Sequence, residues 1–367
     1  MVLAFMTLYC KHLGYTTKQG GFVVAIYGIG SVTGAFFGGK ITDRFGFYYT
    51  QFASLFFGGI LFIALGQMRS YEAIGICTFF LSMVNESFRP ANAAAIAHYS
   101  TEKNRTQSFS LVRLAINLGW GIGVALGGFL ASINYHLLFW TDGFTSIAAS
   151  VSLLIILPKV SLAQQKATHH HTKTNNKSVS PYRDKAFLQF LILTVLFATC
   201  FFQLFTTVPI YFNEGLRLNE FWIGVIMAVN GVLIAIVEMV LVFKLEGRRP
   251  YLLLMCYGSV IMGIAYLILN LSIGNGFMIA LSSMLILTVA EMIGMPFMNS
   301  YYISLSSGQN RGQYAGMYTM AWSLAQVIGS SAGAMIAFSF GFFNLWIIVA
   351  TVCFITAAGY YLLQRKN

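Results

Sequence analysis

Charged residues are scarce in this sequence of 367 residues: Asp, Glu, Lys and Arg together make up only 9% of it. An average soluble protein has about a quarter charged residues. Hydrophobic residues make up 57% of the chain and aromatic residues 16%. That much apolar surface cannot be hidden in the core of a water-soluble protein, so most of it must face lipid. The composition therefore excludes an ordinary soluble enzyme and indicates a membrane protein.

Cysteine is also rare, and the sequence motifs of covalent chemistry are missing. The five cysteines lie in apolar stretches at unrelated spacings, without a C-x-x-C pair or a Cys/His ligand set, which indicates packing residues. No Walker loop, H-E-x-x-H motif or Ser-His-Asp set is present. The run His169-His170-His171 lies among Lys, Thr and Asn and is typical of a polar spacer. We therefore expect no enzymatic activity, no cofactor and no metal site.

What the sequence has instead is a series of long apolar runs. A helix rises 1.5 Å per residue, so about 20 apolar residues cross the ~30 Å hydrocarbon core of a bilayer. The runs are continuously apolar and do not alternate, which favours helices over strands. The predicted helices cover residues 1–10, 20–41, 47–68, 72–99, 107–133, 137–158, 186–212, 219–243, 250–272, 276–304, 313–338 and 342–363.

The positive charges are sorted between the two sides of these helices. One set of connections, with the polar linker at 159–185 and the C-terminus, carries 16 of the Lys and Arg residues, whereas the opposite set carries 4. Such a bias marks the cytoplasmic side. The net charge of +11 is therefore a topology signal, and no nucleic-acid partner is expected.

The two halves of the chain are related. A shift of 206 positions and, nearer the start, one of 203 positions align identical or similar residues, among them Pro90 with Pro296, Arg105 with Arg311, Gly123 with Gly329, Gly28 with Gly231 and Asp43 with Glu246. This is a six-plus-six parallel repeat, which is typical of transporters whose halves rock about a central site. It predicts an N-terminal bundle at 1–158, a cytoplasmic linker at 159–185 and a C-terminal bundle at 186–367.

Comparison of the two repeats shows that the first predicted helix is shorter than its partner in the second half. The partner of the helix beginning at Ala186 would start about 17 residues before Met1, and residues 1–10 cannot span a bilayer. We expect the cytoplasmic half of helix 1 to be truncated, with the missing residues encoded upstream. The alternative is a genuine half-helix.

The loop between the second and third helices carries a spaced motif. It reads G-x-x-x-D-R-x-G, with Gly39, Asp43, Arg44 and Gly46 at the named positions. Gly39 allows close helix approach, and Gly46 permits a positive φ in the short connection. The motif resembles the signature loop of the major facilitator superfamily, although Phe47-Tyr48 replaces the basic pair that usually follows. The resemblance covers the whole chain.

A glycine stripe lies in the predicted fifth helix. Gly119, Gly123, Gly127 and Gly128 form a smooth surface where another helix can pack closely. The spacing resembles the antiporter motif of drug–proton antiporters in the superfamily, with Val124 where that family usually has Pro.

Charged residues inside the apolar runs are candidate functional groups, since a charge there costs at least about 2.5–3.5 kcal/mol. Glu86 and Arg89 are three residues apart on one helix and are expected to pair. Glu291 has no basic residue on its own helix, so burial should favour its protonated form. Glu291, Glu86 and Arg89 are therefore coupling or substrate-site candidates, and either carboxylate could carry the coupling proton or act as counter-ion for a cationic substrate. We favour Glu291 as the proton carrier and interpret Glu86–Arg89 as structural. The alternative is a carboxylate bonded to a nearby Ser or Asn. Asn117 and Asn299 are further substrate-site candidates.

Two other intramembrane charges are expected to lie near the surface. Arg113 is shallow enough for its guanidinium to snorkel to the interface, and Glu238 lies about five residues from the end of its helix. Asp43 is expected, from the resemblance, to contact the beginning of helix 11 near residues 313–317, where unpaired backbone N–H groups favour an anion.

The resemblance implies an all-α membrane protein of the major facilitator fold, with two six-helix bundles and alternating access. It implies a drug or metabolite exporter driven by proton antiport, acting on small lipophilic or cationic compounds as a monomer in the bacterial inner membrane. The alternative is a proton-coupled symporter for a sugar, peptide or organic ion. A polytopic membrane enzyme and a receptor-like member without transport are more remote alternatives.

Overall fold

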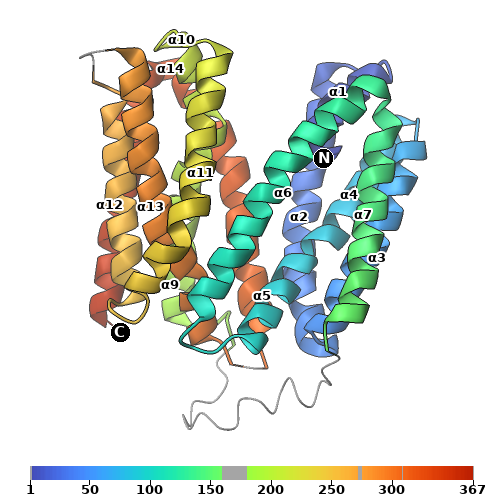
Figure 1. The fold of residues 1–367 in the computed structure, drawn as a ribbon, viewed down its shortest axis with the longest axis horizontal. Coiled ribbons are helices and arrows are strands. Elements are labelled where there is room, and N and C mark those ends of the chain that lie inside the picture. The colour runs from blue at the N-terminus through green and yellow to red at the C-terminus, as the bar shows by residue number, and fades with distance from the viewer. Residues whose placement is uncertain (1, 159–179, 272–274, 308, 367) are drawn as a thin grey trace. The chain divides into compact units, whose positions relative to one another are not determined.

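The structure, a computed structural model, describes residues 2–158, 180–271, 275–307 and 309–366 (Figure 1). It consists of helices joined by short connections. Over these ranges, nine helices are long and apolar enough to cross a membrane. The prediction of a helical membrane protein is confirmed. The histidine run at 169–171 and most of the linker at 159–185 lie outside the described residues.

Polar residues in the loops determine where the helices of the first half begin. Thr16 accepts a hydrogen bond from the backbone of Gln19, whose side chain bonds back to Thr16, so a capping box starts the second helix. Asn134 caps a later helix in a similar way. The helices are α1 (Val2–His12), α2 (Thr17–Phe45), α3 (Phe47–Gln67), α4 (Tyr71–Glu86), α5 (Phe88–Tyr99), α6 (Arg105–Ile133) and α7 (Tyr135–Ile156).

The helices of the second half follow the same rule, with Asp184 and Asn219 as N-caps. They are α9 (Lys185–Phe201), the short 3₁₀ helix η1 (Phe202–Phe205), α10 (Thr207–Glu214), α11 (Glu220–Leu245), α12 (Tyr251–Ile268), α13 (Gly276–Leu305) and α14 (Arg311–Lys366). Within α14, Gly341 has φ 80° and ψ 163°, so two helices meet at a kink there. This kink falls between the predicted eleventh and twelfth helices.

The prediction of one continuous helix over 72–99 is wrong, because the chain is broken between α4 and α5 at Ser87. Pro90 lacks the N–H that would donate to the carbonyl four residues earlier, at Glu86, which explains the position of the break. The Ser87 hydroxyl donates to the carbonyls of Met83 and Gly34. Pro296, the repeat partner of Pro90, lies inside the unbroken α13. The same residue therefore has different effects in the two halves.

The helices form two compact units. The described parts of Met1–Tyr99, Ala115–Pro181 and Ser306–Ser323 make up the first unit, and those of Ser100–Leu114, Tyr182–Leu305 and Leu324–Asn367 the second. In the first unit α2 packs along α4 and α3 along α7, and in the second α12 and α11 pack along α13 (Figure 1). Both α6 and α14 begin in one unit and continue in the other. The predicted bundle boundaries at 158 and 186 stay a prediction.

Small residues allow α2 and α4 to pack at close range. A Cβ atom added to Gly30, Gly34 or Gly38 would collide with backbone or Cβ atoms of Phe79, Ser82, Met83 or Ser87. These three glycines therefore form a packing surface for α4.

Candidate functional site

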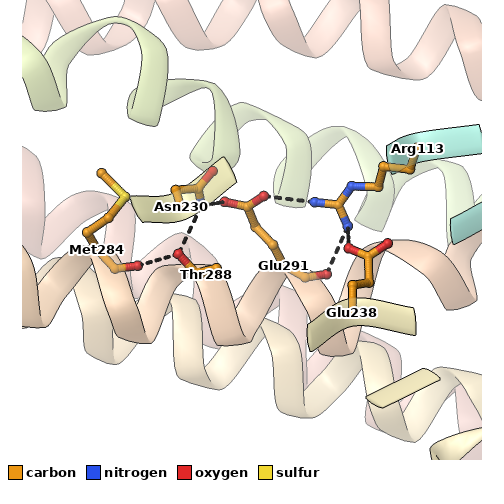
Figure 2. Close-up of polar contacts among 6 residues, drawn as sticks. All are labelled: Arg113, Asn230, Glu238, Met284, Thr288 and Glu291. Atoms are coloured by element: carbon orange, nitrogen blue, oxygen red, sulfur yellow. Dashed lines mark hydrogen bonds and ion pairs between the residues drawn. The ribbon is translucent and has the colours of Figure 1, made fainter. Parts of the chain in front are cut away.

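A buried ionic cluster lies in the second unit (Figure 2). The guanidinium of Arg113, from the first part of α6, donates to two carboxylates. Its Nη1 lies 2.8 Å from Oε2 of Glu238 on α11, and its Nη2 lies 2.8 Å from Oε2 of Glu291 on α13. The side chains of Glu238 and Glu291 are 3% and 2% exposed, whereas that of Arg113 is 18% exposed. The Arg113 side chain is thus the least buried member of the cluster.

The second oxygen of Glu291 is also held. Asn230 on α11 donates from Nδ2 to Oε1 of Glu291 at 3.0 Å and to the hydroxyl of Thr288 at 2.9 Å. The Thr288 hydroxyl in turn donates to the carbonyl of Met284 at 2.7 Å (Figure 2). These contacts fix the orientation of the Glu291 carboxylate from both of its oxygens.

Helical periodicity brings these groups to common faces. Thr288 and Glu291 are three residues apart on α13, and Asn230 and Glu238 are eight residues apart on α11, so each pair shares one side of its helix. Because α11 packs on α13, the two polar faces meet inside the second unit. Arg113 enters this junction from a third helix.

The cluster contains more negative than positive charge. Two carboxylates and one guanidinium leave one negative charge in excess when all three groups are ionised. Oε1 of Glu238 is buried, and the hydroxyl of Ser110, close enough to interact with this carboxyl group, does not make a hydrogen bond of normal geometry with it. Burying uncompensated charge is unfavourable, so the cluster favours uptake of a proton or of another positive charge.

Two expectations about this region are wrong. Arg113 does not snorkel to an interface but pairs with two carboxylates, and Glu238 is buried instead of reaching the membrane surface. Glu291 does lack a basic neighbour on its own helix, yet Arg113, 178 positions away in sequence, supplies one. The bond from Asn230 matches the alternative in which a nearby amide holds this carboxylate. The shared face of Asn230 and Glu238 on α11 was a sequence signal that could have identified them.

The other candidates do not join this cluster. Arg89 Nε lies 2.9 Å from Glu86 Oε2 in the first unit, so the predicted pair is present, although the contact lacks the angle of a hydrogen bond. The Arg89 side chain is 63% exposed. Asn117 is exposed on α6 and Asn299 is half-buried on α13. Their roles in substrate binding stay a prediction.

The signature loop makes the predicted contact with the start of α14. Asp43 accepts hydrogen bonds from the backbone N–H of Gly312 at 2.7 Å and of Gln313 at 2.9 Å, all within the first unit. A helix N-terminus favours such an anion. A Cβ atom on Gly39 would collide with the carbonyl of Gly312, so the helices approach closely here. Gly46 has φ 90°, as its position in the loop required.

The other residues of this loop have different environments. Arg44 is exposed, and its guanidinium lies over the ring of Phe45. Phe47 and Tyr48, which replace the usual basic pair, are buried, and Phe47 packs against His98 at the end of α5. Arg311, at the start of α14, donates to the carbonyl beside His98, that of Ala97. Apolar packing thus replaces part of the loop's charge network.

The second unit contains a related contact. Glu246, the repeat partner of Asp43, accepts a hydrogen bond at 3.0 Å from the backbone N–H of Thr106 at the start of α6. The hydroxyls of Thr106 and Ser300 lie 2.7 Å apart. Each unit therefore places a loop carboxylate at the beginning of a long helix.

The glycine stripe of α6 has mixed surroundings. Gly127 is buried and Gly119 is exposed, and no atom of the described chain lies within 4 Å of a Cβ built on Gly119. Gly123 and Gly128 are half-buried. Close helix packing at Gly119 stays a prediction.

The repeat, the signature loop and its contact with α14 converge on one family. The family model of the Major Facilitator Superfamily matches residues 1–330. This chain belongs to the Major Facilitator Superfamily. As a member of the superfamily it is a multi-pass membrane protein.

Two relatives and one solved structure illustrate where this superfamily member stands. It is 23% identical to multidrug resistance protein 2 of Bacillus subtilis, with 92% of this chain and 84% of that protein covered. It is 24% identical to a Na(+), Li(+), K(+)/H(+) antiporter of Planococcus maritimus, with 96% of this chain and 88% of that protein covered. The human organic anion transporter MFSD10 has a similar fold, with a TM-score of 0.75 and 14% identity over 98% of this chain and 89% of that one.

Proposed function

We propose that this protein exports small lipophilic or cationic compounds by proton antiport with alternating access. Relatives named for multidrug resistance and for cation/proton antiport cover nearly the whole chain and support this proposal. The observation that carries it is the buried cluster of Arg113, Glu238 and Glu291. Its excess negative charge favours binding of a proton in one step of the transport cycle and of a cationic substrate in another.

Glu291 is the proposed carrier of the coupling proton. Its carboxylate is buried, and both of its oxygens are held by side chains of other helices. Protonation would remove the charge attraction between Glu291 and Arg113, so the ion pair that joins α6 to α13 depends on the proton. Glu86 differs because its partner, Arg89, lies only three residues further along the chain, at the start of α5, and is largely exposed. Protonation of Glu86 would weaken this local pair, which joins the end of α4 to the start of α5.

The linker and C-terminus are placed in the cytoplasm in this proposal, because 16 Lys and Arg residues lie on that side and 4 on the other. The membrane is the bacterial cytoplasmic membrane, as the organisms of the two relatives suggest. The protein acts as a monomer on small-molecule substrates and uses neither a nucleic acid nor an enzymatic step.

The test compares Glu291→Gln with Glu86→Gln in proteoliposomes. Glu291→Gln should reduce export driven by a proton gradient about tenfold or more, within the ~5–150-fold range of coupling between sites, while substrate exchange without a gradient continues. Glu86→Gln should keep gradient-driven export. Loss of driven export in Glu86→Gln alone would reverse the assignment, and survival in both variants would remove these carboxylates from coupling.

Export of an alkali cation is a second candidate function. The antiporter of Planococcus maritimus and the excess negative charge at Glu238 and Glu291 favour it. Sodium or potassium flux against a proton gradient, measured beside drug export in the same proteoliposomes, separates the two functions.

A further inference from the structure

The three charged side chains of the buried cluster differ in their exposure and in the helices that carry them. The carboxylates of Glu238 and Glu291 belong to α11 and α13, which pack along each other, and are almost completely buried. The Arg113 side chain is the least buried of the three, at 18% exposed, and it is long and flexible. The two carboxylates are therefore the more buried part of the site, and the guanidinium bridges them from a third helix.

The attachment of Arg113 also differs from that of the carboxylates. Residues 100–114 of α6 belong to the second unit, while the rest of that helix, from Ala115, belongs to the first. Arg113 is thus the next-to-last residue of α6 in the second unit. Its side chain is therefore attached to neither of the helices that carry the two carboxylates.

The two carboxylates are placed to bind a planar group that carries two hydrogen-bond donors. Oε2 of Glu238 and Oε2 of Glu291 each lie 2.8 Å from a different terminal nitrogen of the same guanidinium. A forked group with two N–H donors matches this pair of acceptors, and a spherical charge without donors does not. Oε1 of Glu238, buried without a hydrogen-bond partner of normal geometry among the described residues, offers a further acceptor.

We propose that the Arg113 guanidinium occupies the position of a substrate's cationic group, and that the two compete for Glu238 and Glu291. The substrate class is an organic monocation with two N–H donors, such as an amidinium or guanidinium attached to an apolar body. Binding of this cation displaces Arg113 and so removes the two ion pairs that join α6 to α11 and α13. The inference rests on the proposed export function and names the substrate class and the residue that opposes its binding.

The test measures binding of benzamidinium to the purified full chain in lipid nanodiscs. The key variant is Arg113→Gln combined with Glu238→Gln, which removes the competitor yet keeps the net charge of the cluster at minus one, as in the unmodified protein. Glu291 then has no guanidinium beside it. Benzamidinium should bind this variant at least about tenfold more tightly than it binds the unmodified protein, within the ~5–150-fold range of coupling between sites. Phenyltrimethylammonium, a monocation without N–H donors, should gain much less.

Two single variants keep the inference testable if the double variant does not fold. Arg113→Lys keeps the charge but loses the fork, so benzamidinium should bind more tightly than to the unmodified protein, by less than in the double variant. Glu238→Gln keeps Arg113 and leaves a neutral pair with Glu291, so binding should weaken. Lys103→Gln removes an exposed positive charge elsewhere and should leave the affinity unchanged.

Equal or weaker binding in both the double variant and Arg113→Lys would overturn the proposed competition. So would an equal gain for phenyltrimethylammonium, because general electrostatics would then explain the result. The proposed export function fails separately, if the unmodified protein shows no gradient-driven export at all.

Discussion

Replacing Asp43 with Asn tests the contact between the signature loop and α14. The carboxylate accepts two backbone hydrogen bonds, from Gly312 at 2.7 Å and Gln313 at 2.9 Å. An amide keeps one acceptor oxygen, and its NH₂ group faces the other backbone N–H as a second donor. Hydrogen bonds to a charged group contribute about 1.5–3 kcal/mol each, and a charge at a helix N-terminus about 0.3–1 kcal/mol.

Loss of one such bond and of the charge should weaken this contact by about 2–4 kcal/mol, which corresponds to about 30–1,000-fold in its equilibrium constant. The conformational state that contains the contact loses population, so export should slow sharply while the protein still folds. The assay is initial export rate in proteoliposomes at equal protein content, together with thermal unfolding in detergent. Glu102→Gln, at an exposed loop position, is the matched loss of one negative charge.

A normal export rate in Asp43→Asn would show that this contact has no part in the transport cycle. A fall of the same size in Glu102→Gln would assign the effect to surface charge and not to the two hydrogen bonds.

Two further predictions concern glycines. Gly46→Val should destabilise the protein by about 1–3 kcal/mol, because φ 90° and ψ 155° lie in a region that β-branched residues avoid, and a lower unfolding temperature at unchanged helix content would show it. Gly34→Ala should clearly lower the stability of the fold, since its Cβ would collide with the backbone of Met83. Gly119→Ala should be neutral or stabilising by up to about 1 kcal/mol, because no neighbouring element of the described chain lies within 4 Å of its Cβ. Equal thermal stability of the two alanine variants would contradict the packing argument.

Local features of the sequence predict the membrane-spanning helices, apart from the break at Ser87, and the geometry of the signature loop. Apolar runs of membrane-spanning length predict helices because lipid leaves the backbone no other hydrogen-bond partners. Spacing alone identified Gly46 as a positive-φ position and Gly39 as a point of close approach, and both are found. The contact of Asp43 with the start of α14 followed from the family resemblance together with the unpaired N–H groups of any helix N-terminus. The break at Ser87 was not predicted, because Pro90 and Pro296 are equivalent in sequence but not in structure.

The tertiary structure alone decided the ionic cluster. Arg113 pairs with Glu238 and Glu291 at separations of 125 and 178 residues, distances over which neither periodicity nor local charge spacing carries information. Depth in the helix predicts that Arg113 and Glu238 reach the interface, and the lack of Lys or Arg on its own helix predicts that Glu291 has no cation beside it. Packing of α11 on α13 brings the carboxylates together, and the position of α6 supplies the guanidinium. The sequence shows that charges lie in apolar segments, where burial is costly. The identity of the residue that pairs with each charge depends on which faces of the helices meet in the folded protein.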